Sequence, residues 1–244
     1  MYKQLAGLLR DRILSGEYEE GQQIPSEIEL ARDYDISRMT ARRAVEVLAG
    51  EKLIIRNPGK GSFVSRKKTP YSISTYTSFS KSLQKLGLTV GTKILALEIM
   101  DATIELAEDL EVDIGTPLVL VKRLRFLEGQ PAAYHASYLP ASLFAGLIDM
   151  SSQLQKEPMA DIMEEVSGLK IKYTRDYLEA SSARPSEAIL LNVDKGSPVL
   201  IVRGIAYAKG DLPIRATKAV FRGDYFKFSI EPNIANINNL SNQN

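Results

Sequence analysis

Two groups of arginines have spacings that could bind an anion. Arg38 and Arg42 are four residues apart, so on a helix they would share a face, and Thr40 lies between them. Arg123 and Arg125 are two residues apart, so on a strand they would also share a face. A guanidinium can donate two parallel hydrogen bonds to a phosphate, a carboxylate or the O6 and N7 atoms of guanine. The elements around each group decide which anion it could meet.

The first group lies within a short basic block. The chain of 244 residues has a formal net charge of +1, but residues 36–68 hold nine basic and two acidic side chains. Residues 1–35 hold four basic and eight acidic ones. Such a block is typical of a surface that binds a polyanion. For any single arginine an alternative stays open, because it could simply make the surface soluble.

The residues before this block predict two helices. Apolar residues recur at helical spacing over 5–13, and Gly16 would end that helix. Ser26 and Glu29 fit a capping box, in which each side chain accepts a hydrogen bond from a backbone N–H of the first turn. We therefore expect a second helix to begin directly after Ser26.

The block itself predicts a third helix and a hairpin. Ser37 would cap a helix that ends at Gly50, with arginines in its first turns. Residues 53–55 and 62–64 predict two strands around a turn that contains glycine. This order is typical of a winged helix-turn-helix, whose second helix enters the major groove of DNA. Lys60 in the wing could then reach a phosphate or the minor groove.

Residues 2–65 resemble the DNA-binding domain of the GntR family. The segment IPSEIELARDYDISRMTARRAVEVLAGEKLIIRNPGKGSFV contains the family's P-S-E-x-x-L helix, its S-R-x-T-x-R helix and its glycine-containing wing. The resemblance implies that DNA is contacted by Ser26, Arg38, Thr40, Arg42 and Gly61. From their places on the helix and the wing, we expect Arg43 and Lys60 to contribute as well. Met39 departs from the small polar residue that is usual in the family.

The remainder of the chain predicts an α+β domain. We expect the first domain over 1–66, a linker over 67–76, a second domain over 77–235 and a flexible tail over 236–244. Several predicted strands follow one another through hairpins, so the sheet should be largely antiparallel. The expected helices are 78–86, 103–110, 158–166 and 185–191, and the expected strands are 93–100, 117–127, 170–180, 199–208, 213–221 and 225–230.

The second domain contains an internal repeat. VDIGTPLVLVKRLRFLEGQP at 112–131 parallels VDKGSPVLIVRGIAYAKGDLP at 193–213. Each copy follows a short predicted helix, begins a strand after a Gly-x-Pro turn and returns through a glycine hairpin. Shared turn chemistry alone would not produce this matched order. The repeat therefore predicts a pseudo-symmetric sheet with a cleft between its halves.

The arginine pair belongs to one copy only. Where the first copy has Arg123 and Arg125, the second has Gly204 and Ala206. Paired guanidiniums inside a cleft would suit a phosphate or a carboxylate. The alternative, an exposed strand face with salt bridges, is left open by the residues alone.

Residues 70–235 resemble the UTRA effector domain of the HutC subfamily of GntR regulators, whose fold is chorismate-lyase-like. The segments that carry the resemblance are SFSKSLQKLG, KRLRFLEGQPAAYHASYLP and LPIRATKAVFRGDYFKF. The resemblance implies that Arg123 and Arg125, with the hydroxyls of Ser78 and Ser80, hold an anionic group such as a sugar phosphate.

Two residues depart from that subfamily's pattern. His135 and Arg215 stand where glutamates are usual, so the pocket should be more cationic than in relatives. His135, the single histidine of the chain, could equally have a structural role. We expect the effector site to comprise Ser78, Ser80, Arg123, Arg125, His135 and Arg215.

Taken together, these features predict a repressor that binds double-stranded operator DNA and responds to a small phosphorylated or carboxylated effector. One helix reads only a few base pairs, so we expect a homodimer on a palindromic operator. Two alternatives remain: an enzyme that uses the lyase-like domain while tethered to DNA, and a DNA-bending protein without a ligand. One histidine and no cysteine leave few candidates for acid–base chemistry, so we expect no enzyme activity.

The composition also limits the other partners. The chain has no cysteine, and we expect neither a cofactor nor a metal site. No run of about 18 apolar residues is present, and the first 21 residues carry charges throughout their apolar stretch. We therefore expect no membrane contact, no secretory signal and a cytoplasmic protein.

Overall fold

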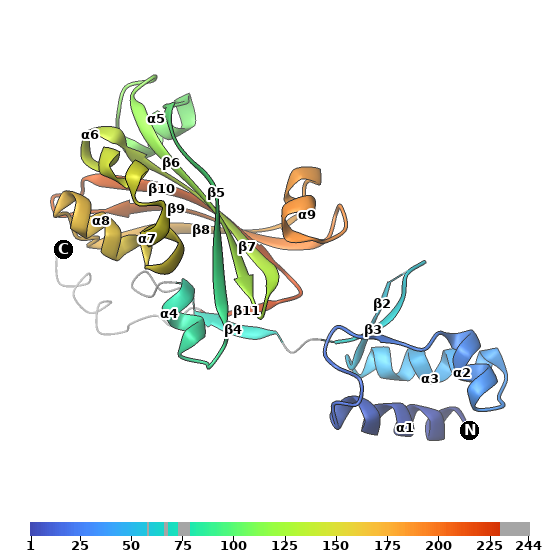
Figure 1. Ribbon diagram of the computed structural model, residues 1–244. Helices are drawn as coiled ribbons and strands as arrows, with labels where there is room; N and C mark the ends of the chain where they lie inside the picture. The colour runs from blue at the N-terminus through green and yellow to red at the C-terminus, as the bar shows by residue number, and fades with distance from the viewer. Residues whose placement is uncertain (58, 66–67, 73–78, 230–244) are drawn as a thin grey trace, which may run out of the picture. The chain divides into compact units, whose positions relative to one another are not determined.

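The computed structural model describes residues 1–57, 59–65, 68–72 and 79–229. The chain divides into two compact units, Met1–Lys68 and Thr69–Asn244 (Figure 1). Within the described ranges, no helix has both the length and the hydropathy that crossing a membrane requires.

The first unit contains three helices and a small sheet around one apolar core. Leu9, Leu30 and Leu48 come from different helices and are almost completely buried against one another. A short strand, which the sequence did not predict, extends the wing hairpin to three strands in the order β1-β3-β2. The elements are α1 (Tyr2–Leu14), β1 (Gln23–Ile24), α2 (Glu27–Asp33), α3 (Arg38–Gly50), β2 (Ile54–Asn57) and β3 (Gly61–Val64).

Side-chain caps fix the starts of α2 and α3. Ser26 Oγ accepts a hydrogen bond from the Glu29 amide at 3.3 Å, and Glu29 Oε2 accepts one from the Ser26 amide at 2.7 Å. This confirms the predicted capping box. Ser37 Oγ accepts from the Thr40 amide at 3.1 Å. Between the two helices Asp35 has a φ of 50°, a left-handed conformation that aspartate tolerates better than most residues. The connection and the caps together set the direction of the first turn of α3.

The second unit is built on a six-stranded antiparallel sheet within the described residues, so the predicted α+β class is confirmed. The strands run in the order β5-β6-β7-β10-β9-β8. The elements are β4 (Thr69–Ser72), α4 (Phe79–Gln84), β5 (Val90–Asp101), α5 (Ile104–Leu110), β6 (Pro117–Leu127), β7 (Gln130–Pro140), α6 (Ala141–Phe144), η1 (Ala145–Asp149), α7 (Ser151–Lys156), α8 (Met159–Ser167), β8 (Tyr173–Ser182), α9 (Pro185–Leu191), β9 (Pro198–Tyr207), β10 (Pro213–Arg222) and β11 (Phe226–Ser229).

The strand order is symmetric about the central pair of β7 and β10. The units α5-β6-β7 and α9-β9-β10 correspond to the two copies of the sequence repeat. Each helix ends at a left-handed residue, Glu111 with a φ of 52° and Asn192 with a φ of 51°. The turns that follow contain Gly115 and Gly196, with φ values of 84° and 85°. The repeated sequence thus produces a repeated backbone.

Helices cover both faces of this sheet (Figure 1). Short helical turns between 141 and 156, which the sequence did not predict, join α8 in burying Phe144, Leu147 and Leu154 against one face. Helices α5 and α9 pack on the other face of the sheet, against residues such as Ala216 and Val220 of β10. Because side chains alternate along a strand, the odd-numbered residues of β10 point to the α8 side.

Part of the predicted linker is a strand of the second unit. Residues 69–72 form β4, which pairs in parallel with β11. Tyr71 is buried there against Phe79 and Phe226, with ring centroids 5.6 and 5.7 Å apart. Burial of these rings stabilises the pairing of β4 with β11 in a separate two-stranded sheet. The polar residues of the expected linker did not indicate this burial. Residues 73–76 of the expected linker and the expected tail at 236–244 lie outside the described residues.

Candidate functional site

One face of α3 carries exposed arginines. The side chains of Arg38 and Arg42 are 69% and 53% exposed, whereas Ala41 and Val45 on the opposite face are buried in the core. Thr40 is half-buried, and its Oγ1 lies 2.8 Å from Ser37 Oγ. The helix therefore presents both guanidiniums to the outside from its first two turns, where a recognition helix contacts DNA.

These arginines belong to a network of ion pairs. Arg38 Nε lies 3.7 Å from Glu27 Oε2, and Arg42 Nε lies 2.9 Å from Glu46 Oε1. Arg56 of the wing strand joins the two acids, at 2.7 Å from Glu27 and 3.6 Å from Glu46. The hydrogen bond from Arg42 lowers the pKa of Glu46. The network holds arginines from α3 and β2 in one array.

Sequence reasoning missed Glu27, Glu46 and Arg56. The four-residue spacing of Arg42 and Glu46 is typical of a helical ion pair and was the available signal. The contact of Glu27 with Arg56 spans 29 residues, so no local pattern reveals it.

The other expected contact residues have different surroundings. The guanidinium of Arg43 lies 4.9 Å from the centre of the Tyr2 ring of α1, and so away from Arg42. Gly61 has a φ of 115°, and a Cβ there would overlap the Gln23 amide, which donates to the Lys60 carbonyl at 3.1 Å. A side chain at position 61 would therefore distort the base of the wing.

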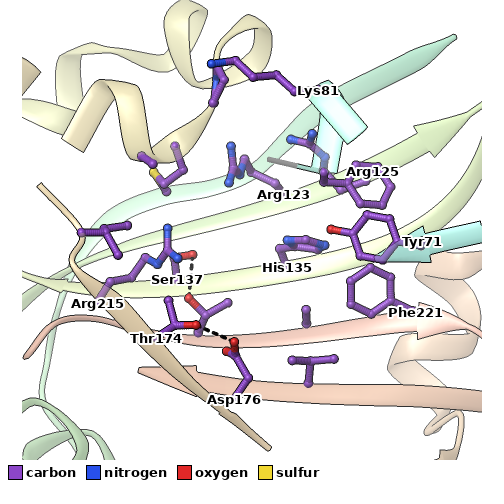
Figure 2. Close-up of a pocket in the computed structure, with 18 of the residues that line it drawn as sticks. Tyr71, Lys81, Arg123, Arg125, His135, Ser137, Thr174, Asp176, Arg215 and Phe221 are labelled. Carbon is purple, nitrogen blue, oxygen red and sulfur yellow. Dashed lines mark hydrogen bonds between the residues drawn. The ribbon is translucent and has the colours of Figure 1, made fainter. Parts of the chain in front are cut away.

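A cavity of about 210 Å³ lies within the second unit, on the α8 face of the sheet. This volume is below the range of about 300–1,000 Å³ that is usual for ligand sites, so the cavity suits only a small metabolite. Its polar and aromatic lining comes from β4, α4, α8 and four sheet strands, β6, β7, β8 and β10 (Figure 2). These lining residues are Tyr71, Phe79, Lys81, Arg123, Arg125, His135, Ser137, Asp161, Thr174, Asp176, Arg215, Thr217 and Phe221.

The arginine pair of β6 is buried in this cavity. Arg123 and Arg125 are only 6% and 4% exposed. Arg125 Nη2 donates to Ser80 Oγ, and its guanidinium lies 4.9 Å from the centre of the Phe79 ring. Arg123 Nη1 lies 3.4 Å from the Leu154 carbonyl oxygen. The Nε atoms of both arginines are buried without a hydrogen-bond partner in the described part of the chain.

His135 and Arg215 also line the cavity. The His135 ring contacts Phe79 and Phe221 edge to face, at centroid distances of 5.6 and 5.3 Å, and its Nε2 has no partner among the described residues. Among the described residues, the Arg215 guanidinium contacts the sulfur of Met163, which lies 3.7 Å from Nη1. Both residues therefore line the same cavity as the arginine pair.

The cavity strongly disfavours added positive charge. Burial lowers the pKa of Arg123 to about 9, and the charges of Arg125 and Arg215 contribute. Burial lowers the pKa of Arg125 to about 10. Burial also lowers the pKa of Arg215, an effect that the Asp176 carboxylate partly opposes. The pKa of His135 lies well below 6.5 because the ring is buried and faces these three cations. An anion in the cavity would reverse each of these effects.

The structure places the two expected hydroxyl residues differently. Ser80 does not line the cavity; its hydroxyl contacts Arg125 and so positions that side chain. Ser78 lies outside the described residues. Seven further polar residues line the cavity that sequence reasoning did not identify; Tyr71, Lys81 and Asp161 lie outside the six-stranded sheet, and the other four are Ser137, Thr174, Asp176 and Thr217. The four on the sheet come from three strands, and their only sequence signal is the two-residue spacing of Thr174 and Asp176.

Comparison with known proteins assigns the chain to a family. Residues 1–64 match bacterial regulatory proteins of the gntR family, and residues 85–227 match the UTRA domain. The chain is 31% identical over 228 residues to the HTH-type transcriptional repressor NagR of Bacillus subtilis, covering 93% of each protein. The chain is a GntR-family transcription regulator of the HutC subfamily, with a UTRA domain.

Other similar proteins agree with this assignment. The mannosyl-D-glycerate transport/metabolism system repressor MngR of Escherichia coli is 26% identical over 232 residues, covering 94% of this chain and 95% of MngR. The crystal structure of PhnF from Mycobacterium smegmatis is 25% identical, covers 93% of this chain and 98% of PhnF, and has a TM-score of 0.64. This GntR-family protein is thus related to transcription regulators and not to enzymes.

Proposed function

We propose that this GntR-family regulator is a repressor released from its operator by a small anionic metabolite that binds in the UTRA cavity. The observation that carries the proposal is that Arg123, Arg125 and Arg215 line one cavity and form no ion pair with a carboxylate of the described residues. Buried charges are normally paired, because removing an ion from water is costly. Three unpaired guanidiniums are therefore explained by a ligand that supplies the counter-charge.

The effector we propose is a phosphorylated or carboxylated metabolite without an amine. His135 and Arg215 line the cavity where related proteins usually have glutamates, so a cationic amine would meet the charge of Arg215 and would find no carboxylate at either position. Two charges about 4 Å apart interact by roughly 4 kcal/mol at an effective dielectric of 20, before desolvation is subtracted. About one third of this energy already changes ligand preference roughly tenfold.

On the DNA side, we propose a homodimer that reads a palindromic operator. Arg38, Thr40 and Arg42 on α3 would contact base edges and phosphates, supported by Ser26 and Arg43, while Lys60 and Gly61 bring the wing to the backbone. One recognition helix contacts few base pairs, so two half-sites about 34–36 Å apart are needed for affinity and specificity. The relatives' names, which refer to repressors, support repression as the direction of control.

The experiment uses an operator selected from random DNA by the purified full chain. Sugar phosphates, sugar acids and amino-sugar phosphates are compared by thermal shift and by release of labelled operator. We expect the amine-free anions to bind and to release DNA, and the amino-sugar phosphates to do so at least tenfold more weakly.

Two variants make the result specific. The double variant Arg123→Ala/Arg125→Ala should keep operator affinity and lose the response, whereas Arg203→Ala, which removes an exposed arginine paired with Glu105, should keep both. Tight, inducing binding of an amino-sugar phosphate would contradict the proposed effector class. Equal ligand affinity in the double variant would contradict the proposed site.

A further inference from the structure

The cavity has an acidic wall opposite its arginines. Asp176 of β8 lines the cavity, and Figure 2 shows it on the side away from Arg123 and Arg125. Its Oδ2 accepts a hydrogen bond from Thr174 Oγ1 at 2.6 Å. In the described part of the chain nothing donates to Oδ1, and the carboxylate forms no ion pair. A hydrogen-bond acceptor is thus available at this wall.

A glycine on the neighbouring strand makes room for this carboxylate. Gly204 of β9 is paired in register with Asp176, and a Cβ at position 204 would overlap Oδ1. The backbone of Gly204 does not have a positive φ, so the glycine is needed for space and not for an unusual conformation. Gly204 occupies the position that Arg123 has in the first copy of the repeat, so the two halves differ where the ligand would lie.

Polar groups connect the two ends of the cavity. The register places Asp176, Gly204, Thr217 and Ser137 in one row across β8, β9, β10 and β7. The hydroxyls of Thr217 and Ser137 lie 3.5 Å apart. Neighbouring strands are about 4.8 Å apart, so β8 and β6 are separated by roughly 19 Å across the sheet. Long arginine side chains shorten this span, but a free phosphate cannot contact both ends.

We propose that Asp176 accepts hydrogen bonds from hydroxyl groups of the effector, which would lie lengthwise between Asp176 and the arginines of β6. The inference rests on the proposed function and specifies the part of the ligand that is not charged. Hydroxyl groups between the two ends would meet the hydroxyls of Thr217 and Ser137.

A neutral hydroxyl suits this wall better than an ammonium group. Arg215 lines the same region, and its positive charge offsets the attraction of the carboxylate for a second cation. A hydroxyl carries no charge and needs only the acceptor. Asp176 therefore adds specificity for polyols without restoring the preference for amines that glutamates at positions 135 and 215 would give.

The test compares inorganic phosphate with the phosphates of glucose, fructose, ribose and mannitol, measured by calorimetry on the full chain. For the wild-type protein we expect at least one polyol phosphate to bind more tightly than inorganic phosphate. A hydrogen bond to a charged acceptor corresponds to about tenfold to hundredfold in affinity. Asp176→Ala should remove about this factor for the polyol phosphate and leave inorganic phosphate within twofold.

Gly204→Ala provides an independent variant. Its added Cβ should displace the Asp176 carboxylate and reproduce the selective loss without removing the acid. The matched control is Glu179→Ala, which removes an exposed acid from the other face of the same strand and should change neither affinity. Thermal melting of each variant checks that the fold is retained.

The outcomes separate the inference from the proposed function. If Asp176→Ala leaves polyol phosphate binding unchanged, or weakens inorganic phosphate equally, the role of Asp176 is wrong while the anion site stands. If no polyol phosphate exceeds inorganic phosphate, the effector class is wrong. If the wild-type protein binds none of these phosphates, the inference is wrong; if it also binds none of the sugar acids, the proposed function is wrong as well.

Discussion

The arginines of α3 and those of the cavity differ in both burial and pairing. Arg38 and Arg42 are more than half exposed and pair with Glu27 and Glu46. Arg123 and Arg125 are almost completely buried and pair with no carboxylate of the described residues. One sequence thus contains two arrangements of the same side chain, one exposed and paired with acids, the other buried without an acidic partner.

The two groups suit ligands of different size: exposed arginines can contact a large polyanion, whereas buried ones can contact only an anion small enough to enter the cavity. An exposed ion pair is worth at most about 1 kcal/mol, so the α3 arginines can exchange their acids for phosphates and bases at little cost. A buried cation without a partner costs several kcal/mol in the unliganded protein. The cavity therefore reduces the stability of the free UTRA domain, and ligand binding recovers it.

The largest effect should come from removing this buried charge. Arg123→Met keeps the approximate volume and loses one hydrogen bond, to the Leu154 carbonyl. Replacing a buried charged group by an apolar one is often stabilising by about 1–4 kcal/mol, so we expect a higher free energy of unfolding without ligand. The same variant should lose the thermal shift produced by anions. Urea unfolding and thermal shift measure the two effects separately.

The matched control for this prediction is Arg203→Met. Arg203 is exposed on the other face of β9 and pairs with Glu105 at 3.6 Å, so its loss should change stability by less than about 1 kcal/mol. A decrease in stability for Arg123→Met would mean that the charge of Arg123 is already compensated. The contrast between the two groups of arginines would then be wrong.

Substitutions on α3 should change DNA affinity and not stability, the opposite of what we expect for Arg123→Met. Arg38→Ala and Arg42→Ala should each weaken operator binding by about 1–3 kcal/mol and relax specificity at one base pair, while stability changes little. Arg10→Ala is the control, because Arg10 is also in an exposed ion pair, with Glu51. Fluorescence anisotropy with single-base operator variants measures both effects. Unchanged affinity in both α3 variants would exclude this face as the operator-reading surface.

The first unit was predictable from sequence almost element by element, because its signals are local. The capping box at Ser26, the cap at Ser37 and the helical spacing of apolar residues each act within a few positions. The ion pairs of Glu27 and Arg56 were not predictable, because they depend on how a strand packs against α2.

The repeat and most strands of the second unit were predictable, but β7, a central strand, was not among the expected ones, and only four residues of the cavity lining were expected. Arg123 and Arg125 were found from their spacing, and His135 and Arg215 from a family pattern. Asp176 was not predicted to line the cavity, because its place there depends on the register of four strands and on the space that Gly204 leaves for its carboxylate. Such information is distributed over the fold, so no local pattern contains it.

A smaller effect should appear in the pH dependence of stability. His135 is held neutral in the folded protein, with a pKa well below the value of about 6.5 that it has when unfolded. Below pH 6.5 the unfolded chain therefore binds a proton that the native state does not. Stability should fall with decreasing pH, by at most about 1.4 kcal/mol per pH unit from this group.

His135→Gln should remove this contribution. The difference in unfolding free energy between the variant and the wild type should change by about 1 kcal/mol between pH 7.5 and 5.5, in favour of the variant at the lower pH. Carboxylates titrate in the same way in both proteins and cancel in the difference. A pH-independent difference would show that His135 is protonated as readily in the native state as in the unfolded chain.

The smallest effect concerns the wing. Lys60 is exposed beside Gly61, at the turn between β2 and β3, so we expect it to contact a phosphate, whereas we expect α3 to contact base edges. A lysine that contacts a phosphate releases about one counterion on binding. Lys60→Ala should therefore weaken binding to all sequences equally and reduce the slope of log affinity against log salt by about one unit. Arg38→Ala should instead affect the selected operator more than random DNA. If Lys60→Ala also changed the base preference, the wing would read sequence, and the division of roles between α3 and the wing would be wrong.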